Sequence, residues 1–316
     1  MPRILDTPDA LRAMSERWRA AGMSVGLVPT MGALHEGHRS LVTRARAECD
    51  RVVASIFVNP TQFSAGEDLS RYPRPIEGDL AMLDAERVDA VFIPAVEAMY
   101  PEGARTTVHL QGALAETLEG AHRPGHFDGV ATVVTKLLVA ARPDRAYFGE
   151  KDAQQLAVVR RLARDLDTGV EIVACPLIRD ADGLALSSRN AYLSPEDRAE
   201  ALAIPRGLAA AATLWNQGER SAACLVEAVQ TELARSPAIA PDYVAVVDPD
   251  SFDAVPQAPR GCRIVVAGRM ATARLIDTIR LGCDEVPVVA GPAGAAAERS
   301  NPRPGRAEWS PPCSVS

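Results

Sequence analysis

Between residues 25 and 178, short apolar runs alternate with longer helical patterns. The runs that indicate buried strands are Val25–Val28, Val52–Val58, Ala90–Pro94, Ala146–Phe148 and Glu171–Ile178. Helical periodicity covers Ser40–Cys49, Glu77–Arg87, Val130–Ala141 and Ala153–Asp165. Strands that alternate with helices favour a parallel sheet that is covered on both faces. The pattern therefore predicts an α/β fold with a Rossmann-like parallel sheet, whose ligands bind at the carboxyl ends of the strands.

The pattern changes after Asn190. Ser194, Pro195 and the two acids that follow are typical of a helix start, and an alanine-rich helix should run from there to about Trp215. The remaining predicted elements are a helix over Ser221–Arg235 and strands over Tyr243–Val247, Arg263–Ala267 and Ala273–Ile279. These elements predict a small α+β domain.

The chain of 316 residues is long enough for two domains. We predict a Rossmann-like domain over residues 1–184 and an α+β domain over residues 185–286. Residues 287–316 are rich in Pro, Gly, Ala and Arg and show no periodicity, so we expect them to form a disordered tail.

The composition excludes several classes of protein. A formal net charge of -7 disfavours a nucleic-acid-binding module, although a local basic pocket for ATP remains compatible with it. The sequence has no run of 18 apolar residues and no apolar segment at its start, so we expect no membrane association. Six cysteines lie without C-x-x-C spacing, which favours free thiols and a reduced cytoplasm.

The segment 29–38, with the sequence PTMGALHEGH, joins a predicted strand to a predicted helix. Gly32 and Gly37 allow a tight turn and close approach of the backbone to a ligand. His35 and His38 are three residues apart and fall on one side of the helix entry. A helix N-terminus offers N–H groups and partial positive charge, which suit a phosphate chain. The segment predicts a nucleotide site built with histidines.

Other interpretations of this segment are weaker. Gly32 and Gly37 have the spacing of a P-loop, but His38 and Arg39 stand where a P-loop has Lys and Ser or Thr. No G-x-G-x-x-G follows the strand, and the two histidines lack further ligands at zinc spacing. If this motif is considered alone, a second interpretation is also compatible with it, namely a helix cap with histidines at the surface.

Three more motifs lie at predicted strand ends or at the domain boundary. Asn59–Phe63 could present amide groups to a small polar ligand, or form an ordinary turn. In Phe148–Gln155, Lys151 could face a phosphate and Asp152 could cap the helix, or the segment could simply be a capped helix. Asp182–Asn190 could be a loop that folds over phosphates, or a polar linker. Together they favour one nucleotide-binding cleft.

In this order, these motifs resemble those of the pantoate–β-alanine ligase family, over roughly residues 1–285. Tyr72–Arg74 and Ala191–Ser194 add to the resemblance. It implies a nucleotidyltransferase fold and a homodimer. It also implies ATP-dependent condensation of (R)-pantoate with β-alanine through a pantoyl-adenylate. Mg²⁺ would bind the phosphates, and the sequence does not identify protein ligands for it.

The resemblance also implies roles for individual residues. The catalytic residues would be His38, usually described as the proton donor, with His35, Lys151 and Arg189. ATP contacts would come from Met31, Gly32, Ala33, Leu34, His35, Glu36, Gly37, His38, Gly149, Glu150, Lys151, Asp152, Ile178, Leu186, Ser187, Ser188 and Arg189. Gln62 and Gln155 would bind pantoate, and Gln62 would also contact β-alanine. Leu186 stands where many relatives have Met, a swap that conserves volume and apolar character.

The implied chemistry suits these side chains. Neutral glutamines can hold a carboxylate without quenching it as a nucleophile, and His38, Lys151 and Arg189 with Mg²⁺ can stabilise charge on the phosphates. Another nucleotidyltransferase of the superfamily would share the H-x-G-H motif but lack the glutamine motifs. A non-catalytic ATP-binding regulator could have lost Lys151 or Ser187–Arg189, yet both are present.

Overall fold

The structure, a computed structural model, describes residues 1–64 and 66–289. The chain divides into two compact units. Among the described residues, the first comprises 1–179, 185–192 and 249–253, and the second comprises 180–184, 193–248 and 254–289. The predicted tail over 287–316 falls almost entirely outside the described residues, which end at 289.

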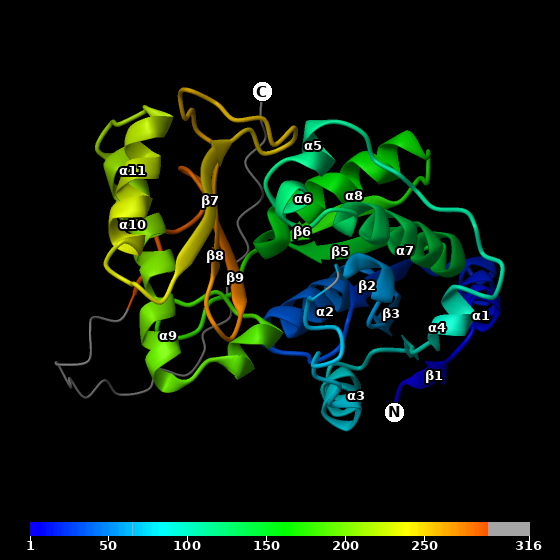
Figure 1. The fold of residues 1–316 in the computed structure, drawn as a ribbon. Coiled ribbons are helices and arrows are strands. Elements are labelled where there is room, and N and C mark those ends of the chain that lie inside the picture. The colour runs from blue at the N-terminus through cyan, green and yellow to red at the C-terminus, as the bar shows by residue number, and fades with distance from the viewer. Residues whose placement is uncertain (65, 290–316) are drawn as a thin grey trace. The chain divides into compact units, whose positions relative to one another are not determined.

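A six-stranded sheet forms the centre of the first unit (Figure 1). Its strands are β1 (Arg3–Leu5), β2 (Val25–Thr30), β3 (Arg51–Ile56), β4 (Ala90–Phe92), β5 (Arg145–Gly149) and β6 (Glu171–Cys175). They lie in the order β1-β4-β3-β2-β5-β6, and every neighbouring pair is parallel. The predicted Rossmann-like α/β fold is confirmed. The order reverses direction between β2 and β5, which is where such sheets bind ligands.

Helices cover both faces of this sheet. One face packs against α1 (Pro8–Ala20), α7 (His126–Ala141) and α8 (Ala153–Asp165), and the other against α2 (Glu36–Glu48) and α3 (Ile76–Ala85). Neighbouring strand residues contribute to opposite cores: Leu27 belongs to the α1–α7–α8 core and Val28 to the α2–α3 core. Because both faces are buried, these strands read as continuous apolar runs.

Shorter elements complete the first unit. They are the helices α4 (Val96–Met99), α5 (Ala113–Glu116) and α6 (Glu119–His122) and the 3₁₀ helices η1 (Pro60–Gln62), η2 (Glu150–Asp152) and η3 (Ser188–Tyr192). Neither β1 nor α1 was predicted from the sequence. A start signal for α1 was present, because Thr7 caps the backbone N–H of Ala10 and Pro8 follows it.

The second unit contains a three-stranded antiparallel sheet and two packed helices. Strands β7 (Ala240–Val247), β8 (Arg263–Arg269) and β9 (Arg274–Arg280) pair in that order, and α10 (Ala203–Asn216) and α11 (Ala222–Leu233) pack against each other and against the sheet. This arrangement confirms the predicted α+β class.

The prediction of a single alanine-rich helix that runs to about Trp215 is wrong. Instead α9 (Pro195–Ala201) ends before α10 begins at Ala203. Pro205 has no backbone N–H to donate to the carbonyl of Ala201, so the helix is interrupted and Pro205 lies in the first turn of α10. Ser194 caps α9 as predicted, because its side chain accepts from the N–H of Asp197 at 3.0 Å.

The sequence predicts a single domain boundary, between residues 184 and 185, but the chain passes between the two compact units more than once. Residues 185–192 belong to the first unit. The N–H of Leu186 donates to the carbonyl of Ile178 at 3.0 Å, and the side chain of Arg189 pairs with Asp68. These contacts hold the loop against the first unit although it follows residues of the second. In the described part of the chain, no helix is long and apolar enough to cross a membrane.

Gly129 in α7 packs directly on the backbone of η1. A Cβ at this position would lie 2.3 Å from the carbonyl oxygen of Thr61 and 2.7 Å from the nitrogen of Gln62. We predict that Gly129→Ala lowers the free energy of unfolding by about 1–3 kcal/mol, because backbone atoms cannot yield to the added methyl group. Chemical denaturation measures this change.

Gly78→Ala is the matched control, because Gly78 also lies in a helix but has nothing within 4 Å of the place that a methyl group would occupy. Alanine should stabilise that helix by up to about 1 kcal/mol. Equal effects of the two substitutions would contradict the proposed close contact.

Candidate active site

A pocket lies at the carboxyl ends of four strands of the parallel sheet. Its lining includes Thr30 at the end of β2, Asn59 after β3, Gly149 at the end of β5 and Pro176 after β6. The pocket thus lies where the strand order reverses between β2 and β5. All of its lining residues belong to the first unit.

Most of the residues singled out from the sequence meet in this pocket. Those that line it are Met31, His35, Gly37, His38, Gln62, Gly149, Lys151, Asp152, Gln155, Ile178, Leu186, Ser187, Ser188 and Arg189. Five others do not line it: Gly32, Ala33, Leu34, Glu36 and Glu150.

Hydrogen bonds to Asp79 stabilise the turn before α2. The Asp79 carboxylate accepts from the N–H of Ala33 at 2.9 Å and from the N–H of Leu34 at 2.7 Å. Ala33 has a left-handed backbone with φ of 51°. We expected this turn to offer its N–H groups to a phosphate chain, but these two already have a protein acceptor. Their contribution is to fix the shape of the turn.

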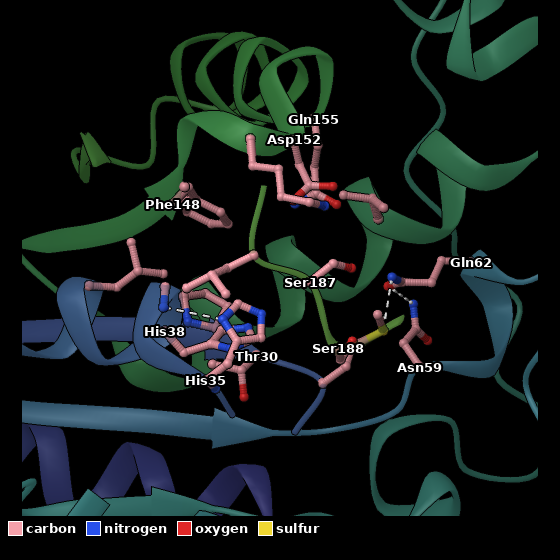
Figure 2. Close-up of a pocket in the computed structure, with 18 of the residues that line it drawn as sticks. Thr30, His35, His38, Asn59, Gln62, Phe148, Asp152, Gln155, Ser187 and Ser188 are labelled. Carbon is pink, nitrogen blue, oxygen red and sulfur yellow. Dashed lines mark hydrogen bonds and ion pairs between the residues drawn. The ribbon is translucent and has the colours of Figure 1, made fainter. Parts of the chain in front are cut away.

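The two histidines of the H-x-G-H motif cap the start of α2. The Nδ1 atom of His35 accepts from the N–H of Gly37 at 3.2 Å, and the Nδ1 atom of His38 accepts from the N–H of His35 at 3.3 Å. Their ring centroids are 4.1 Å apart, and Figure 2 shows both rings at one side of the pocket. A Cβ on Gly37 would lie 2.9 Å from the His35 ring, so glycine lets the ring fold over the turn.

His38 is neutral in this environment. Burial, reinforced by His35 and the positive charge of Lys151, lowers the pKa of His38 to about 3. Because its Nδ1 accepts a hydrogen bond, the single proton of the neutral ring is on Nε2. His38 can therefore donate a hydrogen bond to a ligand through Nε2, but it carries no positive charge. A neutral imidazole at a helix N-terminus is a known electrophilic group in enzymes.

Gln62 and Asn59 form a buried amide pair after β3. The Nδ2 of Asn59 donates to the Oε1 of Gln62 at 3.0 Å, and the Nε2 of Gln62 lies 3.2 Å from the sulfur of Met31 (Figure 2). The Oδ1 of Asn59 accepts from the hydroxyl of Tyr100 at 2.8 Å. This arrangement fixes the Gln62 amide, because its oxygen accepts from Asn59 and its nitrogen donates to the sulfur of Met31, which also lines the pocket.

A second group of polar lining residues, distinct from the Gln62–Asn59 pair, follows the end of β5. Lys151, Asp152 and Gln155 line the pocket, with the Lys151 ammonium 3.7 Å from the Asp152 carboxylate. Asp152 occupies the N-cap position of α8, but its side chain makes no capping hydrogen bond, which corrects the sequence-based expectation. In Figure 2 Asp152 and Gln155 lie together, away from the histidine pair. The neighbouring Gln154 does not line the pocket. It is buried, and its side-chain oxygen accepts a hydrogen bond from the N–H of Glu119 at 3.1 Å.

The loop over residues 186–189 brings hydroxyls and a guanidinium to the pocket. Arg189 makes two hydrogen bonds of 2.9 Å to the carboxylate of Asp68. Ser188 lies 3.1 Å from the hydroxyl of Tyr72, and the guanidinium lies 5.9 Å from the centre of that ring. Burial opposes the charged forms of both groups, but the ion pair outweighs it, so that the pKa of Asp68 is lowered and the pKa of Arg189 is raised.

Some lining residues were not foreseen. Val130, Val133, Val134 and Leu137 form one stripe of α7 that faces the pocket. Their i, i+3, i+4, i+7 spacing was visible, but it indicates a buried helix face in general and does not distinguish a core from a ligand wall. No short motif marks Asp68 or Asp79, because each contacts residues far away in sequence.

The geometry is that of a doubly wound α/β protein with a polar pocket at its switch point. The model of the pantoate-beta-alanine ligase family matches residues 3–280. A pantothenate synthetase of Acidobacterium capsulatum is 52% identical over 271 residues, which cover 86% of this chain and 90% of the relative. One of Thermotoga neapolitana is 50% identical, over 89% of this chain and the full length of the relative. This chain belongs to the pantoate-beta-alanine ligase family.

Solved structures agree. Pantothenate synthetase from Thermus thermophilus is 50% identical, with a TM-score of 0.84 over 88% of this chain and 99% of that one. Pantoate-beta-alanine ligase from Francisella tularensis is 32% identical, with a TM-score of 0.73 over 89% of this chain and 98% of that one, and its structure is a complex with beta-gamma ATP and beta-alanine.

The buried neutral histidine predicts how stability depends on pH. A histidine of the unfolded chain has a pKa of 6.5, whereas that of folded His38 is about 3. Between these values the unfolded state binds more protons, so the free energy of unfolding falls as the pH falls. His38 should account for a loss of about 2 kcal/mol between pH 7 and pH 5.

Urea denaturation of wild type and His38→Gln at both pH values tests this. Burial also lowers the pKa of His126, to about 4, but that residue is present in both proteins and its contribution cancels. The substitution should remove about 2 kcal/mol of the pH dependence. The same pH dependence in both proteins would show that His38 is not held neutral.

Proposed function

We propose that this protein condenses (R)-pantoate with β-alanine in an ATP-dependent reaction, which yields pantothenate, AMP and diphosphate through a pantoyl-adenylate. It is then an acid–amino-acid ligase of the AMP-forming type. The observation that carries the proposal is the meeting of two neutral glutamines with Lys151, Arg189 and a neutral His38 in one pocket at the sheet's switch point. Family membership supports the same reaction.

The polar side chains of the pocket suit both requirements of the adenylation step, holding the acid and stabilising the phosphates. Gln62 and Gln155 would bind the hydroxy acid through neutral donors, so its carboxylate remains a nucleophile for the α-phosphorus of ATP. Lys151 and Arg189 would stabilise the charge that builds on the phosphates, and the Nε2–H of His38 would donate to one of their oxygens. Diphosphate then leaves, and the mixed anhydride is formed.

In the second step the amine of β-alanine attacks the acyl carbon, and AMP leaves. We assign Gln62 to both acids, because its amide follows the end of β3 within the shared pocket. The apolar stripe of α7 would exclude water from the anhydride, which water would otherwise hydrolyse.

Of the residues that the resemblance assigns to ATP, we propose direct contacts for those that line the pocket: Met31, His35, Gly37, His38, Gly149, Lys151, Asp152, Ile178 and the loop 186–189. Glu36, Glu150 and the Gly32–Leu34 turn do not line the pocket, so their role in this proposal is to hold the shape of the site.

Mg²⁺ would enter on the ATP phosphates and neutralise part of their charge. Among the described residues, no group of three or more His, Cys, Asp or Glu is arranged to hold a metal ion. That suits a cation carried mainly by substrate phosphates and water, with Asp152 as the acidic side chain of the pocket lining. The family resemblance adds two further proposals, a homodimer and a cytoplasmic location where ATP is available, and light scattering of the purified protein tests the first.

Exchange of labelled diphosphate into ATP tests the proposed reaction. It should require pantoate, proceed without β-alanine, and fall strongly when Gln155 is changed to alanine, because the acid would lose a hydrogen-bonding partner. Exchange that needs β-alanine would exclude a free adenylate. Equal exchange with an unrelated carboxylic acid would exclude pantoate as the substrate.

Gln154→Ala is the control for that substitution. Gln154 donates to the carbonyls of Leu114 and Thr117 at 2.9 Å each and does not line the pocket. Its loss should lower thermal stability and leave the KM for pantoate unchanged, which separates a ligand contact from a structural one at neighbouring positions.

Lys151 should contribute mainly to the transition state. Lys151→Ala is expected to lower kcat by roughly 10²–10³-fold, equivalent to about 3–4 kcal/mol, while the protein stays folded. Lys136→Ala, a change of the only other lysine in the sequence, should have little effect on kcat. A folded Lys151→Ala variant within about threefold of wild type would contradict the assigned role.

A further inference from the structure

Three charged or titratable side chains lie behind Gln62, outside the pocket lining. Arg123 makes hydrogen bonds of 2.8 and 2.9 Å to the carboxylate of Glu67, and its Nη1 lies 3.1 Å from the Nε2 of His126. The Nδ1 of His126 lies 2.9 Å from the backbone oxygen of Gln62. Neither the family motifs nor the proposed reaction gives any of the three a role.

The partners fix the protonation of His126. A carbonyl oxygen only accepts, so the Nδ1 of His126 carries the proton. A guanidinium only donates, so the Nε2 of His126 accepts from Arg123. The ring is therefore neutral and in one tautomer. Burial and the charge of Arg123 favour the neutral ring and lower the pKa of His126 to about 4, against the opposing effects of the hydrogen bond to Gln62 and of the carboxylates of Glu119 and Glu67.

Both donors converge on the backbone of the residue whose side chain faces the pocket. Besides His126, the Nη2 of Arg123 donates to the Gln62 carbonyl at 3.3 Å. From α7, the carbonyl of Gly129 accepts from Asn59 at 3.2 Å, and Asn59 in turn binds the Gln62 amide oxygen. The backbone and the side chain of Gln62 are thus fixed from the same end of one helix.

We propose that His126 is a positioning residue for the acid-binding glutamine, and that Arg123, held by Glu67, keeps its ring in the tautomer that donates to Gln62. The inference rests on the proposed function, because it takes Gln62 as a contact to the hydroxy acid. Loss of the hydrogen bond would let the turn shift and misdirect the Gln62 amide, whereas Lys151 and Arg189 at the phosphate side would keep their positions.

Steady-state kinetics with three histidine variants test this role. His126→Leu removes both hydrogen bonds, and His126→Asn restores a donor near the position of Nδ1. The Leu variant should raise the KM for pantoate about tenfold or more, and the KM for ATP should stay within about twofold, because only the acid-binding amide is misplaced. The Asn variant should recover most of the loss. His109→Asn, at an exposed histidine 2.8 Å from Asp128, should match wild type.

Equal changes in both KM values, or no change in either, would overturn the proposal and leave His126 a structural residue. If His126→Leu does not fold, Arg123→Met serves instead, since it keeps the ring but removes the donor to its Nε2 and the second donor to Gln62. An unchanged KM for pantoate in folded Arg123→Met would be equally decisive against it.

Nitrogen-15 NMR of the histidine rings gives a readout that does not depend on activity. At pH 7 the wild-type ring of His126 should be the neutral Nδ1–H tautomer, and the Nε2–H tautomer or an imidazolium would overturn the proposed relay. The outcomes also separate the two proposals: a wild-type protein that does not adenylate pantoate contradicts the function, whereas an active wild type with no selective effect at His126 contradicts only this role.

Discussion

The pairing of β2 with β3 on one side and β5 on the other is the constraint on which the site depends. All three strands run parallel, so the segments that follow them leave the sheet at the same edge. Their carboxyl ends are fixed by backbone ladders and by apolar cores on both faces. Segments that lie far apart in the sequence therefore meet at one pocket.

The polar side chains of that pocket are held by hydrogen bonds to other protein groups. His38 accepts from the backbone of His35, Asn59 donates to Gln62, and Arg189 is paired with Asp68. Each contact satisfies a group that burial would otherwise penalise, and each also fixes its direction. The result is a set of donors and charges that are oriented before any ligand arrives, which is the condition for electrostatic stabilisation without reorganisation.

The charges are distributed unevenly among these groups. Lys151 and Arg189 supply the cations of the pocket lining, while the two histidines cap a helix, and His38 is neutral. The bidentate contact of Asp68 with Arg189 occupies the same fork of donors that a phosphate would use. In the proposed function, a phosphate chain at Arg189 would compete with, or share, this carboxylate, and the affinity for ATP would reflect the difference between the two interactions.

The sequence by itself determined five of the six strands of the parallel sheet, the helices α2, α3, α7 and α8, and most of the residues that line the pocket. Apolar periodicity reports local burial, and turn motifs such as the one ending at His38 report local backbone chemistry, so both are legible without a structure. Periodicity could not show that Pro205 divides the alanine-rich segment into two helices. Only the tertiary structure decided that Asp68 meets Arg189, 121 residues away, and that His126 meets the carbonyl of Gln62, 64 residues away. Such contacts depend on the path of the chain in space, which no local pattern encodes.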